Sequence, residues 1–276
     1  MSRQQDFLNL GYDPTVVEPG RMVKPAYAGT LPTSATVNPD YLPPPQAQGT
    51  SQHIGSPGSC AAWASTYGLA TFTAAAKAGQ SPTTSAQWAS PAHIYIEVLK
   101  NYTKPTPQPG TCVGSLLANY LNILQDDGTP SWATAPYYPV CSELWSDYDS
   151  GAANDTNFQI PGWAYVETSN LDDVKAVIAN GGALCYGTAL NPGFMTYDGS
   201  PSPMTGPKEK MKTPDGSLVG HCMLIIGYDD TQNAILIQNS FGPNWGCQWN
   251  GGGGYVWMGY ELFQYLSQGQ AMYVTS

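Results

Sequence analysis

The sequence predicts an α+β protein, and three observations support this prediction. The chain has 276 residues, of which 42% are hydrophobic and only 11% charged, so it can build a sizeable core. Helical periodicity is concentrated before about residue 160. After that point, short apolar runs between Gly- and Pro-rich turns predominate, without the strand–helix alternation that a parallel sheet requires.

Four segments are expected to form helices. The first begins at Cys60, with Ser59 as its N-cap, and continues to about Lys77, where Gly79 ends it. The second starts at Ser90-Pro91, with proline in the first helical position. The remaining two, each with an apolar face at helical spacing, are expected at 115–127 and Leu171–Ala179.

Strands are expected at 183–188, 222–227, Ala234–Gln238 and 255–258. Residues 1–50 contain many Pro and Gly residues and little periodicity, which indicates an extended arm that could act as a propeptide-like cover. Residues 51–276 would then form the main domain, helical over about 51–160 and rich in strands over about 161–276.

Composition excludes several classes of function. The net charge is −10 with only 10 Lys and Arg residues, so the chain lacks the basic footprint of a nucleic-acid-binding protein. No run of about 18 apolar residues predicts a membrane span, and no apolar signal region is visible near Met1. We therefore expect a soluble protein, and the compartment stays open.

The six cysteines include no Cys-x-x-Cys pair, and the chain has three histidines, so neither a zinc site nor another cofactor is expected. Cys112 and Cys141 flank the third predicted helix and are the pair we expect to form a disulfide. Cys185 and Cys222 lie in apolar strand runs and are expected to be buried thiols, while Cys247 has no assigned partner.

The stretch Gly58-Ser59-Cys60 places a cysteine in the first turn of a helix. The free backbone N–H groups and the dipole at a helix N-terminus stabilise an anion, and a thiolate is the reactive form of cysteine. The backbone N–H of Cys60 is also a candidate donor for a developing oxyanion.

Two further residues complete a constellation for nucleophilic catalysis. His221 opens an apolar strand, and Asn239 ends the next strand, 18 residues later. Two antiparallel strands joined by a short turn would bring the imidazole and the amide together, so that the asparagine could orient the histidine. Phe241 or Trp245 could shield this bond from water.

Gly58-Ser59-Cys60, the histidine before a strand ending in Gly227-Tyr228, and Asn239-Ser240-Phe241-Gly242 together resemble the papain (C1) family of cysteine peptidases, in a divergent form of bacterial type. The matching segments follow one another in the same order as in the family, over about residues 43–262. It implies a papain-like fold, in which a helical left lobe and a β-barrel-like right lobe enclose the active-site cleft. It also implies a cysteine endopeptidase that acts on peptide or protein substrates.

The family places a glutamine six residues before the nucleophile, where its amide completes the oxyanion hole. Position 54 is isoleucine in this chain. Gln48 and Gln52 are the two candidates, and Gln48 is preferred because it follows the Pro run and precedes a glycine, as the family's glutamine does.

The resemblance also implies a substrate groove lined by glycine, for which Gly114 is the candidate. Met195, Val219 and Gly220 are expected to contribute a pocket for an apolar side chain just before the scissile residue. Two other functions stay open: an acyl transferase or peptide ligase on the same fold, and a catalytically weak binding protein, which the displaced glutamine would favour. His53 is an alternative base.

Overall fold

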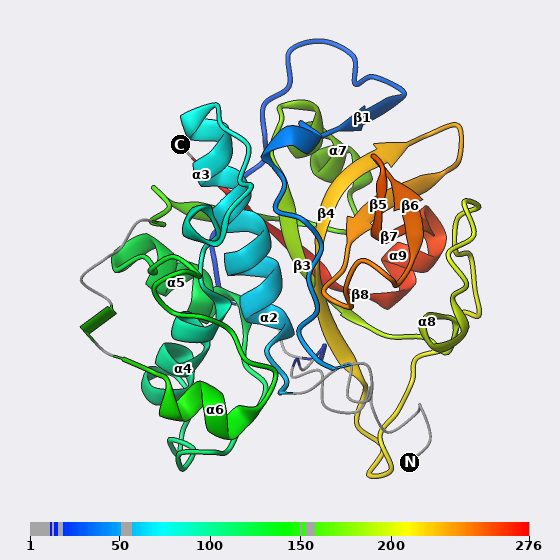
Figure 1. Ribbon diagram of the computed structural model, residues 1–276. Helices are drawn as coiled ribbons and strands as arrows, with labels where there is room; N and C mark the ends of the chain where they lie inside the picture. The colour runs from blue at the N-terminus through cyan, green and yellow to red at the C-terminus, as the bar shows by residue number, and fades with distance from the viewer. Residues whose placement is uncertain are drawn as a thin grey trace.

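The computed structural model describes residues 12, 14–15, 19–50, 57–149, 151–152 and 158–275. These residues adopt the expected papain-like α+β fold. In Figure 1 a group of helices occupies one side of the molecule and an antiparallel sheet the other, with the chain before residue 50 passing between them.

One long helical stretch runs through the helical side. It starts as α2 (Cys60–Ala62), continues as the π-helical segment η2 (Trp63–Ala70) and ends as α3 (Thr71–Ala78), where Gly79 adopts a φ of +63°. The prediction for 60–77 is thus confirmed, although the π-helical geometry was not expected. All of η2 is buried, and Gly68 lets Leu224 of the sheet approach closely.

The helices that follow pack around this stretch. The start predicted for α4 (Pro91–Asn101) is confirmed, with proline in the first position, and the Ser90 hydroxyl caps the helix by accepting a hydrogen bond from the His93 N–H at 3.2 Å. The third predicted helix is α5 (Leu117–Asp126), shorter by two residues at its start. The helical turns η3 (Ser85–Gln87) and α6 (Cys141–Ser146) were not predicted.

The sheet has the strand order β2-β8-β3-β4-β5-β7-β6, and all of its pairs are antiparallel. The four expected strands are present as β3, β4, β5 and β7, with ends that differ from the predicted ones by up to three residues. The strand bounds are β1 Ser34–Thr36, β2 Trp163–Glu167, β3 Leu184–Ala189, β4 Gly220–Asp229, β5 Ala234–Gln238, β6 Cys247–Trp249, β7 Gly252–Gly259 and β8 Ser267–Val274.

Strand β4 is the structural centre of the sheet. It pairs with β3 and β5 along its length and with β1 near its end, and nine of its ten residues are buried. Burial on both faces explains why its sequence is an unbroken apolar run. The predicted helix α7 (Leu171–Ala179) is confirmed, while the short helices α8 (Gly193–Thr196) and α9 (Tyr260–Leu266) were not predicted.

The described part of the N-terminal arm is mostly extended and contains the short strand β1 and the helical turn η1 (Pro39–Tyr41). It is attached to both sides of the molecule. The Tyr67 hydroxyl in η2 donates to the Pro44 carbonyl at 2.6 Å, and the Gln238 amide in β5 donates to the Pro43 carbonyl at 2.9 Å. The arm therefore joins the helical side to the sheet.

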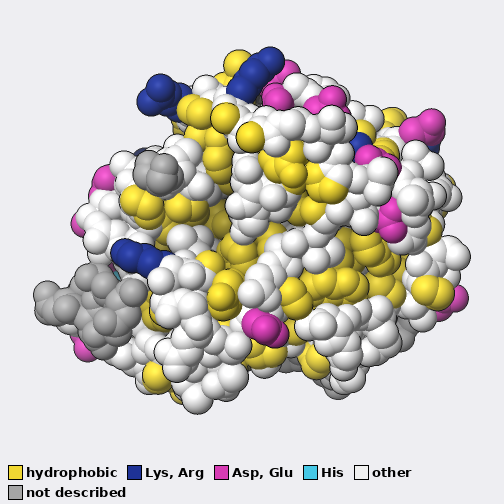
Figure 2. Space-filling model, turned by 90° about the horizontal axis from the view of Figure 1, so that it is seen from above, with side chains coloured by type: hydrophobic (Ala, Val, Ile, Leu, Met, Phe, Trp, Pro, Cys, Tyr) yellow, Lys and Arg dark blue, Asp and Glu magenta, His cyan; other side chains and the backbone are white. Residues whose placement is uncertain are grey.

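The surface has few charges. Figure 2 shows, on the face seen from above, scattered basic and acidic side chains among broad polar and apolar areas. Among the described residues, no helix combines the length and apolar character needed to cross a bilayer. Within the same residues, no group of three or more His, Cys, Asp or Glu side chains is arranged to hold a metal ion.

Candidate active site

Cys60 lies in the first turn of α2 and its side chain is buried. The turn before the helix depends on Gly58, whose φ of +86° is a conformation that residues with a Cβ rarely adopt. Ser59 precedes the helix, but the expected capping hydrogen bond is absent. Its hydroxyl lies instead 2.7 Å from the hydroxyl of Tyr137. This hydrogen bond connects the residue before Cys60 to the loop that carries Tyr137.

His221 is the second residue of β4, and its imidazole is buried. Its Nε2 lies 2.8 Å from Oδ1 of Asn239, which directly follows β5. The pairing of β4 with β5 produces this contact, as the sequence predicted, because the two strands run antiparallel with Leu224 opposite Gln238.

Because Asn239 occupies Nε2, Nδ1 is the ring nitrogen left for the thiol of Cys60. Nδ1 makes no ordinary hydrogen bond within the described residues. The imidazole nevertheless lies close enough to Cys60 to help lower the pKa of its thiol.

The pKa of the Cys60 thiol is the net result of opposing effects. Burial raises it, whereas hydrogen bonding from the Cys222 and His221 side chains and the charge of His221 lower it, to about 6 from the usual 9.0. At neutral pH the thiolate is therefore favoured. Cys222 was expected to be only a buried thiol, and its interaction with Cys60 was not predicted from the sequence.

Two aromatic rings enclose the contact between His221 and Asn239. Phe241 stacks on the imidazole with ring centroids 4.8 Å apart, and Trp245 meets Phe241 edge-on at 5.4 Å. Asn239 is 3% exposed, and its Oδ1 also accepts a hydrogen bond from the Ser240 N–H at 2.8 Å. Both aromatic residues thus lie where the sequence suggested a shield.

Gln48 lies beside this group and is completely buried. Its side-chain oxygen accepts a hydrogen bond from the Ser240 hydroxyl at 2.6 Å, and its backbone N–H donates to the Ser240 carbonyl at 2.9 Å. Its carbonyl accepts from the Tyr137 hydroxyl at 2.7 Å. Gln48 is thereby connected both to the residue after Asn239 and, through Tyr137, to Ser59.

The other candidate glutamine, Gln52, lies outside the described residues, as does the alternative base His53. His93 is buried in α4, where its ring stacks on Tyr148. Tyr137 is a site residue that the sequence did not reveal. It lies 77 residues from Cys60 in the chain, and no local pattern marks a residue whose role depends on such a distant contact.

The residues predicted to line the substrate groove lie in separate parts of the fold. Gly114 is exposed in the loop before α5, and Val219 is buried next to Gly220 at the start of β4. Met195 belongs to α8, but the placement of its side chain is outside what the structure describes.

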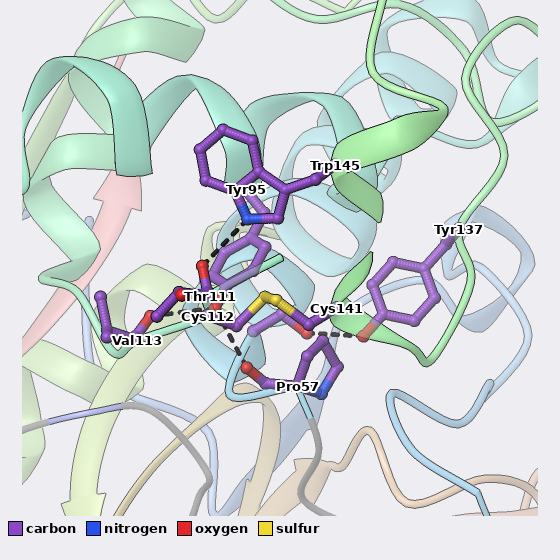
Figure 3. The surroundings of a disulfide bond; sticks show 9 residues. Pro57, Tyr95, Thr111, Cys112, Val113, Tyr137, Cys141 and Trp145 are labelled. Atoms are coloured by element: carbon purple, nitrogen blue, oxygen red, sulfur yellow. Dashed lines mark hydrogen bonds between the residues drawn. A yellow bond between two sulfur atoms is a disulfide. The ribbon is translucent and has the colours of Figure 1, made fainter. Parts of the chain in front are cut away.

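A disulfide stabilises the loop that carries Gly114. Cys112 and Cys141 are joined, as the sequence suggested (Figure 3). The Tyr95 hydroxyl lies 2.9 Å from the Val113 carbonyl and 3.1 Å from that of Pro57, which precedes the Cys60 turn. The loop is therefore held close to the segment leading into α2.

Comparison with solved structures shows the same fold. Xylellain, a cysteine protease from Xylella fastidiosa, superposes with a TM-score of 0.72 at 21% identity, covering 97% of this chain and 96% of its own. Digestive procathepsin L 3 from the Tenebrio molitor larval midgut gives a TM-score of 0.72 at 17% identity, over 100% and 80% of the two chains. The proform of Amb a 11, a cysteine protease and ragweed pollen allergen, gives 0.63 at 16% identity, over 91% and 69%.

A search of curated proteins gives no match. Residues 47–272, however, match the family described as papain family cysteine protease. This match covers most of the chain and includes Cys60, His221 and Asn239. The chain therefore belongs to the papain family of cysteine proteases.

Proposed function

We propose that this protein is a cysteine endopeptidase in which Cys60 is the nucleophile, His221 the general base and acid, and Asn239 the residue that orients the imidazole. The observation that carries the proposal is the contact of His221 Nε2 with Asn239 Oδ1 at 2.8 Å, next to a cysteine whose pKa is lowered to about 6. A thiolate paired with an oriented imidazole is the arrangement that nucleophilic acyl transfer requires.

The reaction follows from these positions. The Cys60 thiolate attacks the scissile carbonyl carbon, and the C=O electron pair moves onto oxygen. When the tetrahedral adduct collapses, the C–N bond breaks and the imidazolium of His221 gives its proton to the leaving amine. Water, deprotonated by His221, then attacks the thioester. This step releases the acid product and regenerates the thiolate.

The oxyanion requires two donors in this scheme. The backbone N–H of Cys60, in the first turn of α2, has no acceptor within the helix, and no backbone acceptor for it is found among the described residues outside the helix, which suits it to this role. The side-chain amide of Gln48 is the second donor. Its support is the hydrogen bond from Ser240 to its side-chain oxygen, which fixes the amide beside the catalytic group.

Labelling with the epoxysuccinyl inhibitor E-64 tests the proposal. We expect one equivalent of inhibitor to attach to Cys60, with loss of peptide turnover, and neither labelling nor turnover in Cys60→Ala. Cys247→Ala is the matched control, since Cys247 is also a buried free cysteine and should leave both unchanged. Turnover that survives in Cys60→Ala would contradict the proposal.

A further inference from the structure

Tyr137 connects the two groups that the proposed mechanism uses to bind the oxyanion. Its hydroxyl lies 2.7 Å from the Ser59 hydroxyl and donates to the Gln48 carbonyl at 2.7 Å. Ser59 directly precedes Cys60, whose backbone N–H is one oxyanion donor, and Gln48 carries the other. In Figure 3 the Tyr137 hydroxyl points toward Pro57, in the segment that leads into α2. One side chain thus connects the segments that carry the two donors.

The direction of these hydrogen bonds follows from the groups involved. A phenol has one proton and a carbonyl can only accept, so Tyr137 gives its proton to the Gln48 carbonyl. The Ser59 hydroxyl is therefore the donor in its contact with the Tyr137 hydroxyl. The result is a directed chain from Ser59 through Tyr137 to Gln48, in which each hydroxyl proton has one acceptor.

The Tyr137 side chain is held rigidly. It is 7% exposed, and its ring meets those of Trp63 and Trp132 at centroid distances of 4.9 and 6.0 Å. Burial raises the pKa of the Tyr137 hydroxyl above its usual value, so the phenol keeps its proton at neutral pH and stays a donor. A packed, protonated phenol keeps a constant distance between its two partners.

Gln48 is fixed on its other side by Ser240. The Ser240 hydroxyl donates to Oε1 of Gln48 at 2.6 Å, and the Gln48 backbone N–H donates to the Ser240 carbonyl at 2.9 Å. The side-chain oxygen is thereby occupied, and the amide nitrogen is the group of Gln48 that can serve an oxyanion. Ser240 ties Gln48 to the end of β5, whereas Tyr137 ties it to the residue before Cys60.

We propose that Tyr137 is a positioning residue that sets the distance between the two oxyanion donors, the backbone N–H of Cys60 and the side-chain amide of Gln48. This inference rests on the proposed peptidase function. An oxyanion hole stabilises the transition state when both donors lie within hydrogen-bonding distance of the same oxygen. Because one donor belongs to a helix and the other to the N-terminal arm, a contact between these segments has to fix their separation, and Tyr137 provides it.

The first test is Tyr137→Phe in the full-length protein. This variant keeps the ring against Trp63 but removes both hydrogen bonds. We expect kcat for peptide hydrolysis to fall about tenfold, with KM within about twofold of the natural value, because a displaced donor costs less than a deleted one, which costs about 10²–10³-fold. An unchanged kcat would overturn the proposal.

Tyr228→Phe is the matched control. The Tyr228 hydroxyl also donates to a backbone carbonyl, that of Pro32, at 2.7 Å, and Tyr228 is buried near the end of β4 opposite His221. Its kcat should equal that of the natural chain. Ser59→Ala breaks the chain at its other end with a smaller change in volume, so it should also lower kcat and leave KM unchanged. If Tyr137→Phe does not fold, a natural kcat in Ser59→Ala would overturn the proposal by itself.

Alkylation separates a displaced donor from an impaired nucleophile. Iodoacetamide consumes the Cys60 thiolate without forming an oxyanion. Tyr137→Phe should therefore be alkylated at the natural rate, with the natural dependence on pH. A loss in alkylation rate as large as the loss in kcat would place the effect of Tyr137 on the thiolate and contradict a role in the oxyanion hole.

A double-variant cycle tests whether Tyr137 acts through Gln48. In Gln48→Ala only the Cys60 donor is left, so the distance between the two donors no longer matters. Adding Tyr137→Phe to Gln48→Ala should then lower kcat by less than about twofold. A further tenfold loss would mean that Tyr137 acts independently of Gln48, against the proposal.

The outcomes distinguish this inference from the proposed function. If the natural chain cleaves peptides and E-64 labels Cys60, but Tyr137→Phe keeps the natural kcat, the positioning role is wrong and the peptidase function stands. If the natural chain neither cleaves peptides nor is labelled at Cys60, the proposed function fails and this inference with it.

Discussion

Nε2 of His221, in β4, and Oδ1 of Asn239, just after β5, lie 2.8 Å apart, and the ring of Phe241 stacks on the imidazole. This contact sets which imidazole nitrogen is available to the thiol. Asn239 would therefore act on catalysis by positioning the histidine.

Asn239→Ala should reduce kcat/KM about ten- to a hundredfold, mostly through kcat, because the imidazole loses the partner that holds its orientation. Steady-state kinetics across pH would measure the change. Asn101→Ala, at an exposed asparagine of α4, should behave like the natural chain. An Asn239→Ala enzyme with unchanged kcat would argue that the asparagine has no positioning role.

Cys222→Ala should raise the pKa of Cys60 above its value of about 6. The Cys222 side chain hydrogen-bonds to Cys60 and lowers that pKa, so its removal makes the thiolate less favourable. The rate of alkylation of Cys60 by iodoacetamide should rise through pH 6 in the natural chain and through a higher pH in the variant. In Cys247→Ala the dependence of the alkylation rate on pH should be the same as in the natural chain. An unshifted curve for Cys222→Ala would show that Cys222 does not help to lower the pKa of Cys60.

Gln48→Ala should lower kcat by about 10²–10³-fold with little change in KM, since an oxyanion-hole donor acts in the transition state. Gln52→Ala, the alternative left open by the sequence, should stay within about twofold of the natural chain. Kinetic comparison of the two variants decides between the glutamines. A large loss in Gln52→Ala alone would reverse the assignment.

Replacing both Cys112 and Cys141 with serine should lower the free energy of unfolding by about 3–4 kcal/mol, the loop-closure entropy for a sequence separation of 29. Urea denaturation monitored by tryptophan fluorescence would measure it. A reducing agent should destabilise the natural chain and have no effect on the double variant. Equal stabilities of the two proteins without reductant would mean that the bond does not restrain the unfolded chain.

The sequence was most informative where local patterns determine structure. Long periodic helices and the apolar runs of β4 and β5 were recognisable, and the register of these two strands brings His221 to Asn239. The edge strand β2 and strand β8 were not predicted, because they form by pairing with each other across about a hundred residues of sequence. Strand β8 also begins with polar residues and contains Gly269, which weakens any strand signal.

The same limit applies to the candidate site. A cysteine at a helix start and a histidine at a strand start are local features, and both were found. The placement of Gln48 depends on Tyr137 and Ser240, far away in the chain, so sequence alone left two glutamines open.

The proposed peptidase function requires that Cys60 form a covalent bond with the substrate's acyl group. Its most direct test is to mix the protein with an activated peptide ester, quench in acid within the first turnover, and map the modified residue by mass spectrometry. We predict one acyl group per chain, attached to Cys60, and none in Cys60→Ala. An acyl group on another of the free cysteines, or hydrolysis without any covalent intermediate, would contradict the account.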